Sequence, residues 1–525
     1  MAAALEFTVD GRRIEVPDDG ASLMEVLRDR LGISTVKDGC SPQGQCGCCT
    51  VWVDGKPRVS CVTPARRVAG RAITTLAGLP PEARIGWGEA FCAAGASQCG
   101  FCTPGIIMRL AGLDARSSGD RPWSGEDRHT SGAVTALAAH LCRCTGWQTI
   151  LEAWDNFGTT APERDWATAA RRAELEGGVP QVVGSTVALG EGGFADDTAP
   201  QGALVALSDG RGGWVLGETL AEARAAAGKV QGRRTPDELP KPLKFPEGDW
   251  AVRLRTSWVE PAYLETDASW CSPGGEPASP LANGGAFGAK AASPLPRIAR
   301  QLADEHGRPV RVLWSREDAV RHGPKRPPVA IGITDDGRGV ARVVRTPGVS
   351  DVIASVAPGL KVEEVDVDGP STSIAIRGAG WVESVVALSA LGDGSGEIVA
   401  PGGGSAWAEW RQGSFRIRVR GGDPLDEIVL RSYCIGAAHM AYSWVTAEAL
   451  TVGPNGEVHD LTIRSFGIVP ASRMPPVEVE IDSSDGPPVK CSDAVFAAVA
   501  AATWRAAGFP PDWPTGSVNF YLTSP

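Results

Sequence analysis

Apolar and polar side chains alternate in two short runs near the start of the chain, and an Asp-Gly pair interrupts each run. LEFTVDGRRIEV has this pair at Asp10-Gly11, and TVWVDGKPRVSC has it at Asp54-Gly55. Alternation is typical of half-buried strands, and Asp-Gly favours the tight turn of a β-hairpin. Between the runs, SLMEVLRDRLG has helical spacing of apolar residues and ends at Gly32. The pattern predicts two hairpins with a helix between them.

Helical spacing replaces strand-like alternation beyond residue 80. Residues 106–113 follow Pro104, which suits the first turn of a helix. VTALAAHLC and residues 147–154 give two further helical segments, and residues 87–94 give a weaker one. We therefore expect a small helical bundle over residues 81–157.

The remaining two thirds of the chain mixes strand-like and helix-like runs. Residues 158–178 are polar and end in glycines, which predicts a linker with a short surface helix. Strand-like runs follow at ALVALSD, RVLWS, RVVRT, FRIRVRG and HDLTIRSFGIV, with helical LAEARAAAGKV and RIARQLADEHG between them. The alternation of types predicts a mixed α/β domain over residues 179–525, within an α+β multidomain protein.

Length and charge narrow the classes of partner. The chain has 525 residues and a net charge of −11, with no long basic run, so nucleic acid is an unexpected partner. No apolar run reaches the roughly 18 residues that cross a bilayer, and the N-terminus lacks the pattern of a secretory signal. We expect a cytoplasmic protein that binds no membrane.

Cysteine is concentrated at one end of the chain. The chain holds 13 cysteines, and those before residue 150 are Cys40, Cys46, Cys48, Cys49, Cys61, Cys92, Cys99, Cys102, Cys142 and Cys144. A disulfide framework is typical of small secreted domains, and this chain is neither small nor marked for export. Clustered thiols in a reducing compartment favour metal binding.

The spacing separates these thiols into two sets of four. The first is Cys40-x5-Cys46-x2-Cys49-x11-Cys61, close to the plant-type ferredoxin pattern, although Cys48 could replace a neighbour. The second joins Cys99-x2-Cys102 to Cys142-x-Cys144 within the helical region. Structural zinc could use the same number of thiols, but C-x-C is an uncommon zinc spacing and paired sets suit electron transfer. The remaining five cysteines are expected to be buried thiols.

These residues resemble the iron–sulphur portion of the xanthine oxidase family, also called molybdenum hydroxylases. The motifs are GCSPQGQCGCCTVWVDG, SQCGFCTPGIIM and LCRCTGWQ, and the resemblance covers about residues 5 to 157. It implies two [2Fe-2S] clusters, one in a ferredoxin-like β-grasp domain over residues 1–80 and one in a helical-bundle domain over residues 81–157. It also implies a molybdopterin-type molybdenum cofactor, with Gln98 touching the pterin and Cys144 between pterin and cluster.

The resemblance continues more weakly into a shortened molybdopterin-binding-like α/β domain over residues 179–525. NGGAFGAK resembles the family's Gly-rich molybdenum loop, and IRGAGWVES resembles a second cofactor-facing motif. Among 65 glycines such a loop also arises by chance. The residues that this correspondence assigns to the cofactor are Gly284, Gly285, Phe287, Gly288, Arg377 and Gly378.

The base that the family carries in a Gly-x-Gly-Glu motif near the C-terminus has no counterpart here. No glutamate follows Glu480, and the nearest carboxylate, Asp493, fits a helix N-cap before AVFAAVAAA. Glu383, in WVES, is a second weak catalytic candidate that we expect to be structural. The catalytic residue is therefore left open.

Two redox functions fit these motifs. One is an oxidoreductase that oxidises a small molecule, an aldehyde or N-heterocycle, and passes electrons from a molybdopterin site through both clusters. The other is an electron-transfer subunit whose C-terminal half is a non-catalytic docking scaffold. A third alternative is a zinc-bound or apo interaction protein with no redox role. No FAD-binding segment separates the two halves, so we expect a separate FAD-binding subunit or another acceptor, and the chain could form an oligomer.

Overall fold

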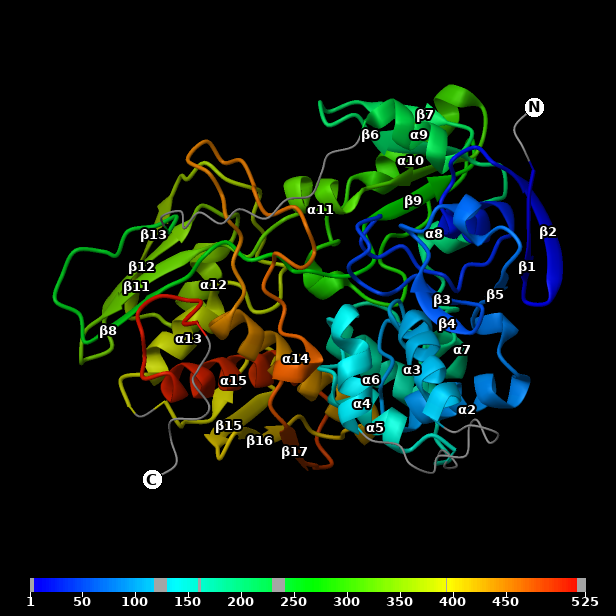
Figure 1. Cartoon of the computed structure of the whole chain (residues 1–525). Helices are drawn as coiled ribbons and strands as arrows, with labels where there is room; N and C mark the ends of the chain where they lie inside the picture. Colours follow the sequence, from blue (N-terminus) through cyan, green and yellow to red (C-terminus); the bar gives the residue numbers. More distant parts are fainter. Residues whose placement is uncertain (1–3, 118–129, 159–161, 229–240, 393, 517–525) are drawn as a thin grey trace.

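The described residues form an N-terminal sheet, a group of helices and three further sheets (Figure 1). The computed structural model describes residues 4–117, 130–158, 162–228, 241–392 and 394–516. The N-terminal sheet and the helices lie on one side of the molecule, and the last two sheets lie on the other. Mixed α/β architecture is therefore present, as the sequence pattern predicts.

The N-terminal sheet contains both predicted hairpins. Its five strands run in the order β2-β1-β5-β3-β4. Both Asp-Gly turns have positive φ at each residue, which the type I′ geometry requires. The sequence pattern did not indicate the central strand β5. The strands are β1 (Ala4–Val9), β2 (Arg12–Pro17), β3 (Thr50–Val53), β4 (Lys56–Val59) and β5 (Ala72–Thr74).

The predicted helix between the hairpins is present. It starts as α1 (Leu23–Glu25) and continues as a π-helical turn, Val26–Arg30. Ser22 caps its N-terminus in a reciprocal capping box with Glu25. Gly32, at φ 67°, ends it.

Helices dominate residues 81–157, in agreement with the apolar spacing. α2 packs against α5, and α4 packs against both α3 and α5. The helices are α2 (Pro81–Ala93), α3 (Thr103–Ser117), α4 (Thr130–Ala136) and α5 (Gln148–Asp155).

The expected surface helix of the linker was wrong in one respect. Helix α6 (Trp166–Gly177) begins at the N-cap Asp165 and buries one face completely, including Arg172 and Glu176. That face packs against helix α14 (Glu427–Thr446). The hydrophilic composition of this segment predicted an exposed helix, but two of its charged residues, Arg172 and Glu176, are buried as an ion pair.

Three four-stranded sheets form the C-terminal half, with strand orders β7-β6-β10-β9, β13-β12-β11-β8 and β14-β15-β16-β17. The first comprises β6 (Leu204–Ser208), β7 (Trp214–Gly217), β9 (Ala268–Cys271) and β10 (Val310–Leu313). The second comprises β8 (Val252–Arg255), β11 (Val329–Ile333), β12 (Gly339–Val344) and β13 (Leu360–Val365). The third comprises β14 (Ile398–Val399), β15 (Ser405–Arg411), β16 (Ser414–Arg420) and β17 (Val477–Asp482).

Helices cover these sheets. α9 packs on β6 and β7, α10 on β9 and β10, and α12 on β13. The predicted helices LAEARAAAGKV and RIARQLADEHG are thereby confirmed as α9 and α10, and residues 229–230 of the first lie outside the described residues. The short α11 carries the sequence REDAVRH. Bounds are α7 (Ser185–Ala188), α8 (Ala195–Thr198), α9 (Leu220–Ala227), α10 (Leu295–His306), α11 (Arg316–His322), α12 (Val349–Val356) and α13 (Trp381–Ser389).

Helix α14 and helix α15 (Ser492–Ala506) form the centre of the C-terminal core. Both are buried on nearly all sides, because α14 also contacts α6 and α15 also contacts β15 and α13. The Ala-rich run at residues 494–504 is thus buried within α15.

One predicted strand was wrong. HDLTIRSFGIV, residues 459–469, forms turns and extended backbone that belong to no sheet. Its backbone polar groups bond instead to the N-terminal loop: Ile463 N–H donates to Gln43 Oε1 at 3.1 Å, and Leu461 O accepts from Gln43 Nε2 at 2.9 Å. The segment therefore contacts the Cys40–Cys49 loop.

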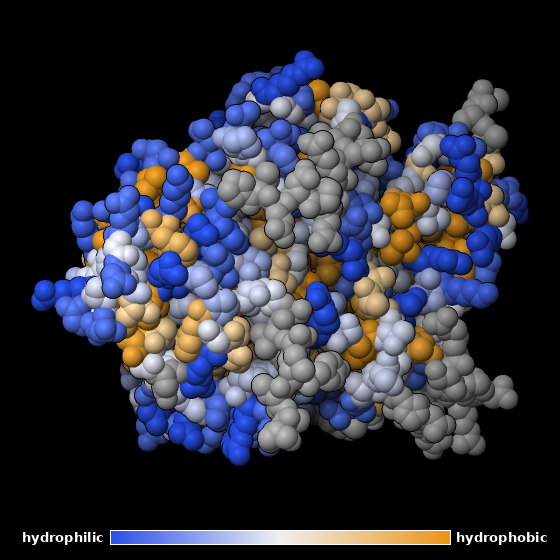
Figure 2. All heavy atoms as spheres, turned by 60° about the vertical axis from the view of Figure 1, so that its left-hand side comes forward, coloured by the Kyte–Doolittle hydropathy of each residue, from blue (hydrophilic) through white to orange (hydrophobic). Residues whose placement is uncertain are grey.

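One face of the molecule is mainly hydrophilic. Figure 2 shows charged and polar side chains over most of one face, with apolar residues in separate groups. In the described part of the chain, no helix has both the length and the apolar character needed to span a bilayer.

Candidate functional site

The first four thiols meet in the loop between α1 and β3 and at the end of β4. We call Cys40, Cys46, Cys49 and Cys61 the N-terminal thiol set; each is at most 4% exposed. Thiol contacts link Cys40 to Cys46 and to Cys61, and Cys61 to Cys49. Hydrogen bonds from Cys46 and Cys61 hold the pKa of Cys40 well below its ordinary value, so this sulphur is the preferred thiolate.

The helical region brings the second four thiols together. We call Cys99, Cys102, Cys142 and Cys144 the helical thiol set. The Sγ atoms of Cys99 and Cys144 lie 3.7 Å apart, and Cys102 contacts Cys142. The hydrogen bond from Cys102 lowers the pKa of Cys142 to about 6. Both pairs lie before the N-terminus of a helix: the first precedes α3, and the second precedes α5.

The other five cysteines are buried, as expected. Cys48 lies beside Cys46, whereas Cys49 Sγ accepts the Cys61 N–H at 3.5 Å. Within the described ranges, no three side chains among His, Cys, Asp and Glu converge as the ligands of one metal ion do.

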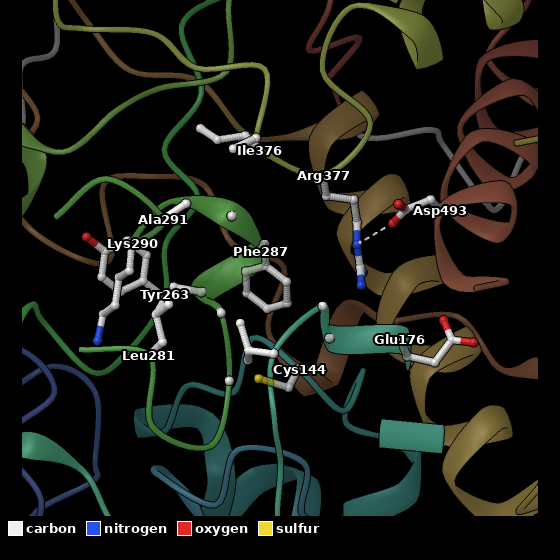
Figure 3. A pocket seen from close by; sticks show the side chains of 18 of the residues that line it. Cys144, Glu176, Tyr263, Leu281, Phe287, Lys290, Ala291, Ile376, Arg377 and Asp493 are labelled. Carbon is white, nitrogen blue, oxygen red and sulfur yellow. Dashed lines mark ion pairs between the residues drawn. The ribbon is translucent and has the colours of Figure 1, made fainter. Parts of the chain in front are cut away.

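A cavity of about 560 Å³ adjoins the helical thiol set. Cys99, Cys102 and Cys144 line it, so three of the four thiols share a wall with it. The structure brings all the residues that the resemblance assigned to the cofactor to this cavity: Gln98, Gly284, Gly285, Phe287, Gly288, Arg377 and Gly378. Side chains from segments far apart in sequence meet there (Figure 3).

Gln98 fixes the wall nearest the helical thiol set. Its Nε2 donates to Cys144 O at 2.9 Å and to Ser432 Oγ of α14 at 3.0 Å. α14 approaches closely there because position 436 is glycine: a Cβ at Gly436 would lie 1.7 Å from Cys144 O. The sequence thereby positions the C-x-C loop against the C-terminal core.

The Gly-rich loop contacts Arg377 through both backbone and side chain. Arg377 N–H donates to Phe287 O at 3.0 Å, and a Cβ at Gly288 would lie 1.7 Å from Ala375 O. The Arg377 guanidinium lies over the Phe287 ring, 5.3 Å from its centroid. Glycine at position 288 thus permits the contact between the two predicted motifs.

Arg377 is buried rather than at the surface, and its ion-pair partner is Asp493. Arg377 Nε lies 3.1 Å from Asp493 Oδ1 (Figure 3). Lys490 Nζ lies 2.8 Å from Asp493 Oδ2. Two cations sharing one carboxylate leave positive charge at this end of the cavity. The expectation that Asp493 is an N-cap was wrong, because α15 begins after Cys491 and Asp493 lies in its first turn.

Glu176, which the sequence reasoning missed, takes the capping role at α15. Its carboxylate accepts the Ser492 N–H at 2.9 Å and the Cys491 N–H at 3.1 Å, and it lies 3.4 Å from Arg172. The positive end of the helix dipole and the guanidinium both favour its charge. No local signal in the polar segment of residues 158–178 indicated this contact.

Glu265 and Lys290 form a second ion pair in the cavity, at 2.6 Å. Lys290 lies in the predicted Gly-rich motif, but the sequence gave it no role, and Glu265 had no signal. Burial raises the pKa of Glu265 to about 7, although Lys290 opposes the shift. Glu265 is thus a cavity carboxyl able to exchange a proton near neutral pH.

Glu383 does not line the cavity. Its carboxylate pairs with Arg326 through bonds of 2.6 and 3.0 Å and also accepts the Gly380 N–H. Both oxygens are therefore engaged in holding the start of α13.

The comparisons with known proteins agree with this geometry. Residues 75–155 match the family described as [2Fe-2S] binding domain. The xanthine dehydrogenase iron-sulfur-binding subunit of Escherichia coli O157:H7 is 38% identical over 28% of this chain and 89% of its own length. An aldehyde oxidoreductase from Megalodesulfovibrio gigas is 40% identical over 26% of this chain, a match that spans 14% of that relative's length.

A solved structure extends the likeness to the whole fold. The crystal structure of the aldehyde oxidoreductase from Desulfovibrio desulfuricans aligns over 100% of both chains with a TM-score of 0.70, at 14% identity. Together, the fold, the thiol sets and the matched domain define an iron–sulphur protein of oxidoreductase type. The chain belongs to the molybdenum hydroxylase family, also called the xanthine oxidase family.

Proposed function

We propose that this chain passes electrons from a molybdopterin site in the cavity, through the helical and then the N-terminal thiol set, to a separate acceptor. Each set would hold one [2Fe-2S] cluster. The observation that carries the proposal is the shared wall, because three thiols of the helical set line the same cavity as Arg377 and the Gly-rich loop. Electron transfer needs such adjacency between a substrate site and a cluster.

The residues of the cavity fit a bulky, negatively charged cofactor. Glycine backbone at positions 284, 285 and 288 allows close approach, and Arg377 with Lys490 supplies excess positive charge. Glu265, which lines the cavity, has a buried Oε1 with no hydrogen-bond partner in the described residues. The volume lies within the range of cofactor pockets.

In this arrangement the cofactor, when bound, would supply oxidative hydroxylation of a small molecule, an aldehyde or N-heterocycle. Gln98 and Arg377 would hold it, Phe287 would form an apolar wall, and Glu265 would accept or donate a proton. Electrons would leave from the N-terminal thiol set to an FAD-binding subunit or another acceptor.

The alternative is an electron-transfer subunit whose C-terminal half is a scaffold. One observation favours it: Asp493, the one of the two sequence-predicted carboxylates that lines the cavity, is held in ion pairs by two cations. Metal and pterin analysis of the purified protein separates the two functions. Molybdenum and pterin at about one per chain support the enzyme, whereas iron and sulphide alone support the scaffold.

The proposal that each thiol set holds its own cluster can be tested by removing one ligand. We predict that Cys102→Ser removes one [2Fe-2S] signal from the electron paramagnetic resonance (EPR) spectrum of the reduced protein and leaves the other. Cys92→Ser, which changes a buried thiol outside both sets, is the matched control and should keep both signals. Loss of both signals from folded Cys102→Ser protein would show that the two sets are not independent.

A further inference from the structure

Arg316, the first residue of α11, is a fully buried cation beside the N-terminal thiol set. It comes from the C-terminal half of the chain. Its Nη2 donates to Gly39 O at 2.7 Å and to Leu264 O at 2.6 Å. Gly39 directly precedes Cys40, and Leu264 lines the cavity. One guanidinium therefore joins the cavity wall to the cysteine loop.

The charge of this guanidinium has no ion-pair partner in the described residues. No carboxylate lies within ion-pair distance of Arg316, and its Nε and Nη1 have no hydrogen-bond acceptor. The acidic residues next to it are engaged elsewhere: Glu317 accepts from Gln43 Nε2 at 2.8 Å, and Asp318 accepts from Ser315 Oγ at 2.7 Å. The Tyr263 ring, 5.8 Å away, supplies only a weak cation–π contact.

An isolated buried charge is costly and calls for an opposite charge nearby. Its position at the start of α11 adds to the cost, because the N-terminus of a helix repels cations. Beside the Glu317 carboxylate, which interacts electrostatically with Arg316 without forming an ion pair, the N-terminal thiol set is a nearby group able to carry negative charge. Gly39 lies against it: a Cβ at Gly39 would lie 3.1 Å from Cys46 Sγ.

We propose that Arg316 raises the reduction potential of the cluster held by the N-terminal thiol set. A four-thiolate [2Fe-2S] cluster is negatively charged, and its reduction adds one more negative charge. A fixed cation in a poorly solvated position stabilises the reduced form more than the oxidised form. Arg316 would thus make this cluster the better electron acceptor, drawing electrons away from the cavity. The inference rests on the proposed cluster assignment.

The test is an EPR-monitored redox titration of the intact protein, in which the two clusters are followed separately. Arg316→Gln should lower the reduction equilibrium constant of the N-terminal cluster about tenfold, equivalent to roughly 59 mV for one electron. The cluster of the helical thiol set serves as an internal reference and should keep its potential. An unchanged N-terminal potential, or an equal shift of both clusters, overturns the proposal.

Two variants separate charge from packing. Arg464→Gln removes the same charge from an exposed side chain that donates to Gln45 O, beside Cys46. Because solvent screens this charge, the variant should change the reduction equilibrium constant of the N-terminal cluster by less than roughly twofold. Arg316→Lys loses the guanidinium geometry but keeps the charge. Because the charge sets the effect, the reduction potential of the N-terminal cluster should stay near that of the parent protein. If Arg316→Gln fails to fold, a large fall in Arg316→Lys still contradicts the proposal. A parent protein without an N-terminal cluster signal would refute the cluster assignment instead.

Discussion

Glu176 connects helix α6 to the start of helix α15 and to the cavity. Its carboxylate satisfies two backbone N–H groups of the α15 N-terminus and balances the charge of Arg172, and both side chains are fully buried. Removing one partner of a buried pair leaves the other charge uncompensated. This contact therefore contributes to the free energy of unfolding and also positions α15 against α6.

We predict that Glu176→Gln lowers the free energy of unfolding by roughly 3 kcal/mol, because Arg172 loses its counter-charge. Urea unfolding followed by circular dichroism measures the change. Glu174→Gln, at an exposed position of the same helix, is the matched control and should change stability by less than about 0.5 kcal/mol. Equal stabilities for the two variants would contradict the assigned role.

Glu265 gives a pH-dependent prediction. Burial raises its pKa from 4.5 to about 7 in the folded protein, so the folded state binds a proton more tightly than the unfolded state. The stability of the parent relative to Glu265→Gln should therefore be greatest below pH 4.5 and fall until about pH 7. Urea unfolding of both proteins across this range measures the difference. A difference that does not vary with pH would contradict the buried position.

At the scale of elements, glycine lets α3 touch the cysteine loop of the N-terminal sheet. A Cβ at Gly105 would lie 2.3 Å from Gly47 O and 2.7 Å from Cys48 O. Both neighbours are backbone atoms that cannot rotate away. This close contact holds the two thiol sets near each other.

We predict that Gly105→Ala destabilises the protein by about 1–3 kcal/mol through overpacking, although alanine is the better helix former. Gly132→Ala in α4 is the matched control, because its new Cβ would meet nothing closer than 3.7 Å. That variant should gain up to about 1 kcal/mol. Calorimetric unfolding of both variants tests the sign difference, and a stabilised Gly105→Ala would refute the contact.

Elements determined by local residues could be predicted from the sequence. The hairpins follow from alternation and Asp-Gly turns, and α9 and α10 follow from apolar spacing. Strand β5 was missed because its three residues pair only with distant strands. Residues 459–469 alternate like a strand, but their polar groups bond to the Gln43 and Gln45 region. No local pattern reports such long-range contacts.

The same limit applies to the candidate site. Cysteine spacing predicted the two thiol sets, and the Gly-rich motif with Arg377 predicted part of the cavity. The sequence gave no role to Glu176, Glu265 or Arg316, and their roles depend on burial. Whether a single charged residue is buried depends on the whole fold, so local composition cannot predict it.

At the scale of the whole molecule, the C-terminal half packs directly against the iron–sulphur half. The Arg143–Glu448 pair is buried between the C-x-C loop and the C-terminal half, with bonds of 2.5 and 2.7 Å. Arg28 adds a second connection through Asp196 and Asp197. The cavity and both thiol sets therefore form one connected unit, which suits electron transfer over short steps.

The central claim is that eight thiolates hold two [2Fe-2S] clusters. Quantifying iron and acid-labile sulphide in the purified protein, with EPR of the reduced form, tests it most directly. We predict about four irons and four sulphides per chain and two distinct [2Fe-2S] signals. A colourless protein that contains zinc, with no acid-labile sulphide, would contradict the account.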